Sequence, residues 1–122
     1  MFKVMLVEDD LTMFSLLSTL LEMEGFEVVK LMEENPVRII QTLQQQLPDL
    51  VLLDVHLRQF NGLDLLKQIK QDVRFHKVKI LMSSGMNFRA ECLEAGADDF
   101  ILKPYMPDAL IAQIHRLLKP VK

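Results

Sequence analysis

The segment PDLVLLD, residues 48–54, places four apolar residues between a proline–aspartate pair and a second aspartate, Asp54. Four residues are too few for a helix, and they lack the polar–apolar alternation of a half-exposed strand. We therefore expect a short strand buried on both faces, as in parallel sheets that helices cover. A carboxylate at the end of such a strand is costly to bury without a partner, so Asp54 is a candidate functional residue.

Segments of the same kind recur along the chain. Short apolar runs begin near Val4, Val28, Leu50, Lys79 and Phe100, so that successive starts lie 24, 22, 29 and 21 residues apart. Between the runs, apolar residues recur at intervals of three and four, which is the spacing of an amphipathic helix. These helical stripes are Met13–Leu21, Val37–Leu47, Leu66–Val73, Phe88–Ala95 and Leu110–Leu118.

The alternation of five strands with five helices predicts a three-layer, doubly wound α/β fold. Its five-stranded parallel sheet would have the order 2-1-3-4-5, which is the flavodoxin-like arrangement. The run Val28–Met32 is interrupted by Lys30, as suits a strand at the edge of the sheet. Gly25 and Gly96 follow helical stripes, where a left-handed helix cap is expected. Because no repeat or linker interrupts the pattern, we expect residues 1–122 to form a single domain.

The composition of the chain excludes several classes of protein. Its 17 acidic and 14 basic residues give a formal net charge of −3, which disfavours direct binding to nucleic acid or to an anionic membrane. No apolar run approaches the about 20 residues that span a bilayer. The opening segment MFKVMLVEDD turns acidic too early for a secretory signal. The single cysteine, Cys92, can form no intramolecular disulfide, and we expect a cytoplasmic protein.

Polar residues follow most of the predicted strands. Glu8, Asp9 and Asp10 come after the first strand, Asp54 ends the third, Ser83 and Ser84 end the fourth, and Lys103 follows the fifth. In an open parallel sheet, ligands bind beyond the carboxyl ends of the strands, where the first and third strands diverge. Converging carboxylates repel one another unless a cation lies among them, and oxygen ligands suit Mg²⁺. A metal ion, an ammonium group and a hydroxyl around one carboxylate would stabilise a phosphoryl group in transit, with Asp54 as its nucleophile.

Each of these residues alone also fits a purely structural role. Asp10 precedes a helical stripe and is expected to cap that helix. Glu8 and Asp9, each taken alone, fit a capping role and a functional role equally well. Ser83 alone would be an ordinary turn residue, and Lys103 alone an ordinary surface charge. Their joint position at the ends of four strands favours a phosphoryl-transfer site.

Four motifs, taken in order, are similar to those of a known family. They are VMLVEDD, residues 4–10; PDLVLLDVHLRQFNGLDLL, residues 48–66; ILMSSG, residues 80–85; and GADDFILKP, residues 96–104. With them the chain resembles, from about Lys3 to Leu118, the receiver domain of bacterial two-component response regulators. That family has the strand order predicted above.

The resemblance implies a role for each residue of the predicted site. Glu8 and Asp9 correspond to the acidic pair that holds Mg²⁺ together with Asp54, the phosphoacceptor. The backbone carbonyl of His56 corresponds to the ligand that completes the metal site.

The remaining positions correspond to the parts of a conformational switch. Ser83 matches the hydroxyl that turns toward the phosphoryl group, and Phe100 matches the aromatic residue that packs inward when the hydroxyl moves. Lys103 matches the lysine that pairs with the phosphate, and Pro104 suggests a cis peptide bond that directs this lysine.

By the same resemblance, a histidine kinase or phosphotransfer protein would donate a phosphoryl group to Asp54. Phosphorylation would reshape the face formed by the fourth helix, fifth strand and fifth helix, where a downstream protein partner binds. The domain would catalyse only its own phosphorylation and dephosphorylation and would not act as an enzyme on other substrates. Self-association into a homodimer is a further possibility that the resemblance leaves open.

The chain also departs from the family pattern in three places. Arg58 replaces a usual proline and Asn61 replaces a common aspartate, both in the loop after the third strand. The segment from Ser83 to Lys103 is about two residues shorter than usual, near the start of the fourth helix.

Other functions fit the residues less well. A degenerate receiver that binds partners without phosphorylation is the main alternative, although every site position holds a chemically competent residue. A magnesium-dependent phosphatase that uses Asp54 would need an insertion to cover its substrate, and the predicted loops are short. A flavodoxin-like electron carrier is excluded because Glu8, Asp9 and Asp10 would repel the phosphate of its cofactor.

Overall fold

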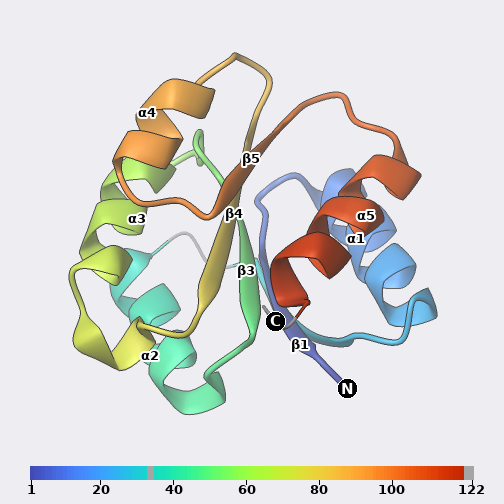
Figure 1. Cartoon of the computed structure of the whole chain (residues 1–122), viewed down its shortest axis with the longest axis horizontal. Helices are drawn as coiled ribbons and strands as arrows, with labels where there is room; N and C mark the ends of the chain where they lie inside the picture. Colours follow the sequence, from blue (N-terminus) through green and yellow to red (C-terminus); the bar gives the residue numbers. More distant parts are fainter. Residues whose placement is uncertain (33–34, 120–122) are drawn as a thin grey trace.

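Strands and helices alternate along residues 1–32 and 35–119, which the computed structural model describes (Figure 1). The strands are β1 (Lys3–Val7), β2 (Glu27–Leu31), β3 (Leu50–Asp54), β4 (Lys79–Ser84) and β5 (Asp99–Leu102). The helices are α1 (Leu11–Met23), α2 (Pro36–Gln46), α3 (Gly62–Lys70), α4 (Arg89–Glu94) and α5 (Pro107–Leu118), with a short 3₁₀ turn at Val73–Phe75.

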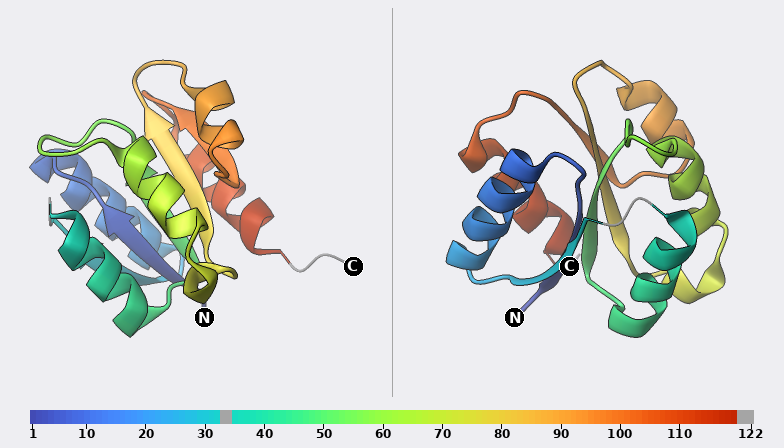
Figure 2. Two further views of the ribbon diagram at one scale, coloured as in Figure 1. Left: turned by 90° about the vertical axis from the view of Figure 1, so that its left-hand side faces the viewer. Right: turned by 180° about the vertical axis from the view of Figure 1, so that it is seen from behind.

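The strands form one parallel sheet in the order β2-β1-β3-β4-β5, which confirms the predicted topology. Helices α1 and α5 cover one face of the sheet, and α2, α3 and α4 cover the other (Figures 1 and 2). Strand β2 lies at an edge, and its Lys30 is exposed, as expected for an edge strand. No helix in the described ranges is long and apolar enough to cross a membrane.

The central strands are apolar throughout because both faces of the sheet are buried. On β3, Val51 and Leu53 pack under α2, α3 and α4, whereas Leu50 and Leu52 pack under α1 and α5. All four side chains are at most 2% exposed. Burying a side chain of this size contributes about 1.5–3 kcal/mol, so the two faces together fix β3 at the centre of the sheet.

The helix ends follow local side-chain chemistry. Asp10 caps α1, because its Oδ1 accepts a hydrogen bond of 3.0 Å from the backbone N–H of Met13. Asn61 caps α3 in the same way through the N–H of Leu63, at 2.7 Å. Gly25 and Gly96 have φ angles of 89° and 104°, which are the left-handed conformations predicted for them.

Two predicted helical stripes were wrong in detail. Helix α2 buries Ile39 and Leu43, whereas Val37 and Leu47 are mostly exposed, so the buried stripe is shifted around the helix. Helix α3 ends at Lys70, and Val73 is 83% exposed in the 3₁₀ turn that follows it. Asp72 starts that turn by accepting a hydrogen bond from the N–H of Arg74, and Phe75 takes the buried position instead.

Gly62, the first residue of α3, packs tightly against the end of β3. A Cβ atom there would overlap the backbone carbonyl oxygen of Asp54, whereas a Cβ atom on Gly85 would meet nothing within 4 Å. We expect Gly62→Ala to lower the free energy of unfolding by about 3 kcal/mol. Urea denaturation checks this, with Gly85→Ala as the matched control that leaves stability nearly unchanged. Equal stability of the two variants would contradict the packing described here.

Candidate functional site

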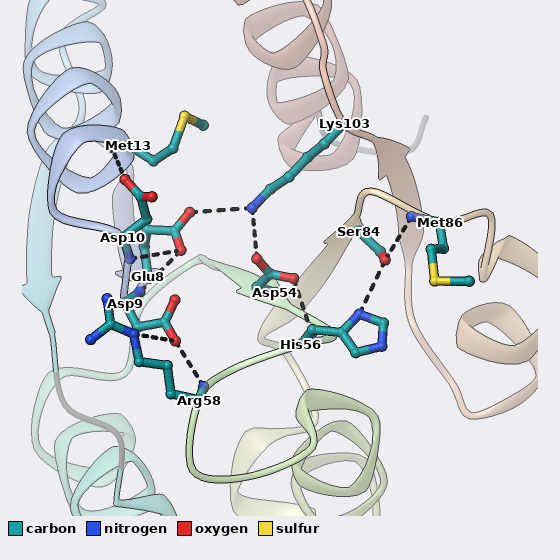
Figure 3. Close-up of polar contacts among 10 residues, drawn as sticks. All are labelled: Glu8, Asp9, Asp10, Met13, Asp54, His56, Arg58, Ser84, Met86 and Lys103. Carbon is teal, nitrogen blue, oxygen red and sulfur yellow. Dashed lines mark hydrogen bonds and ion pairs between the residues drawn. The ribbon is translucent and has the colours of Figure 1, made fainter.

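The carboxyl ends of three strands bring a lysine between two carboxylates (Figure 3). Lys103, which follows β5, places its Nζ 2.6 Å from Oδ2 of Asp54 and 3.3 Å from Oε1 of Glu8. Strands β1 and β3 are neighbours, and Val7 pairs with Leu53, so the next residues along each strand, Glu8 and Asp54, meet at one edge. The structure thus brings together three of the predicted site residues.

Burial controls the charge of this cluster. Glu8 is 4% exposed, and its Oε2 accepts hydrogen bonds from the backbone N–H groups of Asp9 and Asp10, at 3.0 and 3.4 Å. Burial raises the pKa of the Glu8 carboxyl above its usual value, outweighing the opposite effect of the Lys103 charge. Burial alone would lower the pKa of Lys103, but its hydrogen bond to Asp54 and the carboxylate charges raise it.

Asp9 is held by the loop between β3 and α3. Its Oδ2 accepts a 2.8 Å hydrogen bond from the backbone N–H of Arg58, and the Arg58 Nε lies 3.9 Å from the same oxygen. Proline, which is usual at this position in the family resembled above, has no N–H group to donate. The departure at Arg58 therefore creates a contact to a predicted metal ligand, which the sequence did not reveal.

His56 completes this side of the site. Its backbone N–H donates a 3.0 Å hydrogen bond to Oδ1 of Asp54, so both oxygens of the Asp54 carboxylate are engaged. Its imidazole Nδ1 lies 3.4 Å from the hydroxyl oxygen of Ser84, at the end of β4. The loops that follow β3 and β4 are thus connected beside Asp54.

The donor atoms of the predicted metal site suit Mg²⁺ chemically. The carboxylates of Glu8, Asp9 and Asp54 and the carbonyl of His56 are hard oxygen donors. Three carboxylates face two cations, Lys103 and Arg58, and a divalent cation would offset the negative charge that is left. In residues 1–32 and 35–119, no three His, Cys, Asp or Glu side chains are gathered closely enough to hold a metal as they stand. Glu8 and Asp54 face Lys103, and Asp9 faces Arg58.

The predicted switch residues lie on β4 and β5. Ser83 is 3% exposed and pairs with Asp54 in the parallel register, so both side chains leave the sheet on the same side. Phe100 is 4% exposed and packs in the core under α2, α3 and α4. The Phe100 carbonyl accepts hydrogen bonds from Arg89 of α4 and Gln113 of α5, at 3.3 and 2.9 Å. This carbonyl connects the three elements of the predicted output face.

Tyr105 adds a feature that the sequence did not predict. The Lys103–Pro104 peptide bond is cis, as expected, and Tyr105 follows it. The Tyr105 hydroxyl is buried and has no hydrogen-bond partner within the described part of the chain. Burial, as the main cause, raises the pKa of Tyr105 to about 12, so the hydroxyl keeps its proton.

The sequence matches a known family over nearly its whole length. Residues 4–115 match the family described as the response regulator receiver domain. The chain belongs to this family. It is therefore a receiver domain of two-component signalling rather than a conventional enzyme, and receiver domains work with histidine kinases.

Relatives of two lengths share this domain. The chain is 41% identical over 120 residues to a CpxR homologue, a transcriptional regulatory protein of Haemophilus influenzae. That match covers 98% of this chain and 51% of the relative, so the chain spans about half the length of this regulator. The chemotaxis protein CheY of Bacillus subtilis is 32% identical over 120 residues, covering 95% of this chain and 97% of CheY.

Solved structures share the fold. A response regulator of Chloroflexus aurantiacus aligns with a TM-score of 0.86 and 28% identity, covering 96% of this chain and 97% of the other. The receiver domain of a sensor histidine kinase of Pseudomonas aeruginosa aligns with a TM-score of 0.82 and 22% identity, covering 96% and 97%. At 22% identity the likeness concerns the fold alone. The Pseudomonas aeruginosa structure holds a magnesium ion in its active-site cleft.

Lys103 should control how the stability of this receiver domain depends on pH. We expect Lys103→Met to destabilise it by about 2 kcal/mol at neutral pH, because two buried carboxylates lose a charged hydrogen-bond partner. The loss should also raise the pKa of Glu8 further. A carboxyl whose pKa is higher in the folded chain binds protons on folding, so its contribution to stability falls as pH rises.

The variant should therefore lose stability more steeply than the wild type as pH rises above about 4.5, the ordinary pKa of a glutamate. Urea denaturation at several pH values measures the slopes. Lys30→Met is the control, since Lys30 forms an exposed ion pair with Glu22 at 3.3 Å. Parallel slopes for the wild type and Lys103→Met would contradict the coupling of Lys103 to Glu8.

Proposed function

We propose that Asp54 accepts a phosphoryl group from a histidine kinase or a phosphotransfer protein, and that the domain is a phosphorylation-dependent cytoplasmic signalling switch. The contact of 2.6 Å between Lys103 Nζ and Asp54 Oδ2 carries this proposal. It puts a fixed positive charge where the oxygens of a phosphoryl group on Asp54 would lie. Membership of the receiver family supports the same role.

Glu8, Asp9, Asp54 and the backbone carbonyl of His56 would hold Mg²⁺ in this proposal. A bound Mg²⁺ neutralises the charge that gathers on the phosphoryl oxygens during transfer. A receiver domain of the same fold holds magnesium in its active-site cleft, which supports the proposal. For Asp9 to bind the metal ion, one of two changes is needed. Either the N–H of Arg58 gives up its hydrogen bond to Asp9 Oδ2, or Asp9 binds the metal through its other oxygen, Oδ1.

The transfer itself exchanges one bond to phosphorus for another. A carboxylate oxygen of Asp54 attacks the phosphorus, and the bond from phosphorus to the donor histidine nitrogen breaks. Lys103 then turns from the Asp54 carboxylate to the phosphoryl oxygens. Later hydrolysis of the acyl phosphate restores the carboxylate and resets the switch. His56 and Gly85 lie two residues beyond Asp54 and Ser83 in the sequence, and we propose that access of water past them influences the lifetime of the phosphorylated state.

The output would pass through the switch residues. The hydroxyl of Ser83 moves toward the new phosphoryl oxygens, and Phe100 and its carbonyl contacts follow. Because Arg89 and Gln113 hold that carbonyl, the α4–β5–α5 face changes shape for a downstream protein partner or for a second copy of the chain. We propose no direct contact with nucleic acid for these residues.

Phosphorylation itself is the direct test. We expect incubation with acetyl phosphate and Mg²⁺ to add one phosphoryl group to the protein, as measured by intact mass. Asp54→Asn should abolish the adduct, and Asp64→Asn, an exposed aspartate on α3, should retain it. A folded wild type that binds Mg²⁺ without forming an adduct would instead favour a degenerate receiver that binds partners without phosphorylation.

Ser83 should be required for the change of the α4–β5–α5 face but not for phosphorylation of Asp54. We expect Ser83→Ala to be phosphorylated on Asp54 while the amide NMR signals of α4, β5 and α5 shift much less than in the wild type. The hydroxyl that couples the phosphoryl group to Phe100 is missing in this variant. Shifts as large as those of the wild type would show that the signal takes another path.

A further inference from the structure

A chain of contacts connects the loops that follow β3 and β4. His56 donates its backbone N–H to Asp54, and its ring lies 3.4 Å, through Nδ1, from the hydroxyl oxygen of Ser84. That oxygen also accepts a 3.1 Å hydrogen bond from the backbone N–H of Met86 (Figure 3). His56 therefore links Asp54 at the end of β3 to Ser84 at the end of β4.

Phe88 packs against this imidazole. The ring centroids of His56 and Phe88 are 5.3 Å apart with an interplanar angle of 58°, within the range of about 4.5–7 Å that aromatic pairs prefer. Phe88 is half-buried against the core, and its carbonyl accepts a 2.9 Å hydrogen bond from the N–H of Cys92 in α4. The exposed His56 ring thus rests on a side chain that the core and α4 hold in place.

We propose that Phe88 is a positioning residue that holds the His56 ring between the loops that follow β3 and β4 and thereby slows hydrolysis of the phosphoryl group on Asp54. The inference rests on the proposed function, because it concerns the decay of the phosphorylated state. The ring of Phe88 packs on the His56 ring, and the proposed effect of Phe88 on the decay passes through that contact.

Hydrolysis needs a water molecule beside the phosphorus. The water oxygen forms a new bond to phosphorus while the bond from phosphorus to the Asp54 oxygen breaks. The Asp54 carboxylate keeps the electron pair, and both protons of the water leave with the inorganic phosphate. A ring fixed between the two loops excludes water from that side, whereas a ring without its support from Phe88 samples other rotamers and opens the path.

The test follows the decay of the phosphorylated protein by intact mass after acetyl phosphate is removed. We expect Phe88→Leu to speed the decay roughly threefold to tenfold, the rate equivalent of one aromatic ring contact. Phe88→Tyr keeps the ring and should decay like the wild type. His56→Ala should also speed the decay, and adding Phe88→Leu to it should change the rate no further, because Phe88 acts through His56. Phe2→Leu, at the exposed opposite end of β1, is the matched control with an unchanged rate.

An unchanged decay rate in Phe88→Leu would overturn the inference, and so would effects of the two substitutions that multiply. Thermal denaturation checks folding, and Phe88→Met replaces Phe88→Leu if the latter does not fold. A wild type that forms no adduct defeats the proposed function and this inference together. An adduct on Asp54 whose decay ignores Phe88 defeats this inference alone.

Discussion

One lysine shared between two buried carboxylates is the constraint on which the site depends. Glu8 and Asp54 reach the same sheet edge because β1 and β3 are adjacent and in register, and without a cation their charges would repel. Lys103 contacts both, so it ties the end of β5 to β1 and β3 across the carboxyl edge. The positions of these two carboxylates therefore depend on the same cation. Adding a dication or a phosphoryl group there must move Lys103.

Much of the fold follows from the sequence because burial leaves a local signature. A strand buried on both faces is apolar throughout, and β3 could be recognised for this reason. Lys30 marked the edge strand, and Asp10 marked the start of α1, because each acts within its own segment. The stripe of α2 was misjudged because Leu47, which the sequence groups with the buried side chains, ends the helix in a left-handed conformation and points outward.

The convergence of the site could also be predicted, since the carboxyl ends of parallel strands share one edge. The contacts between residues of different loops could not be predicted, because they depend on distances across the fold. Examples are the hydrogen bond from Arg58 to Asp9, the Ser84–His56 contact and the packing of Phe88 on His56. The partners in the first two contacts are 49 and 28 positions apart in the sequence. The departures from the family pattern thus show their physical effect only in the structure.

The proposed function depends on where a metal ion and a phosphoryl analogue bind to the protein. The most direct measurement is a crystal structure of the protein with Mg²⁺ and beryllofluoride, which mimics a phosphoryl group on a carboxylate. We predict beryllofluoride on Asp54, Mg²⁺ beside Glu8 and Asp9, and the Lys103 Nζ turned from the Asp54 carboxylate to the fluorides. Beryllofluoride or Mg²⁺ bound elsewhere, with Lys103 still paired to Asp54 and Glu8, would contradict the account.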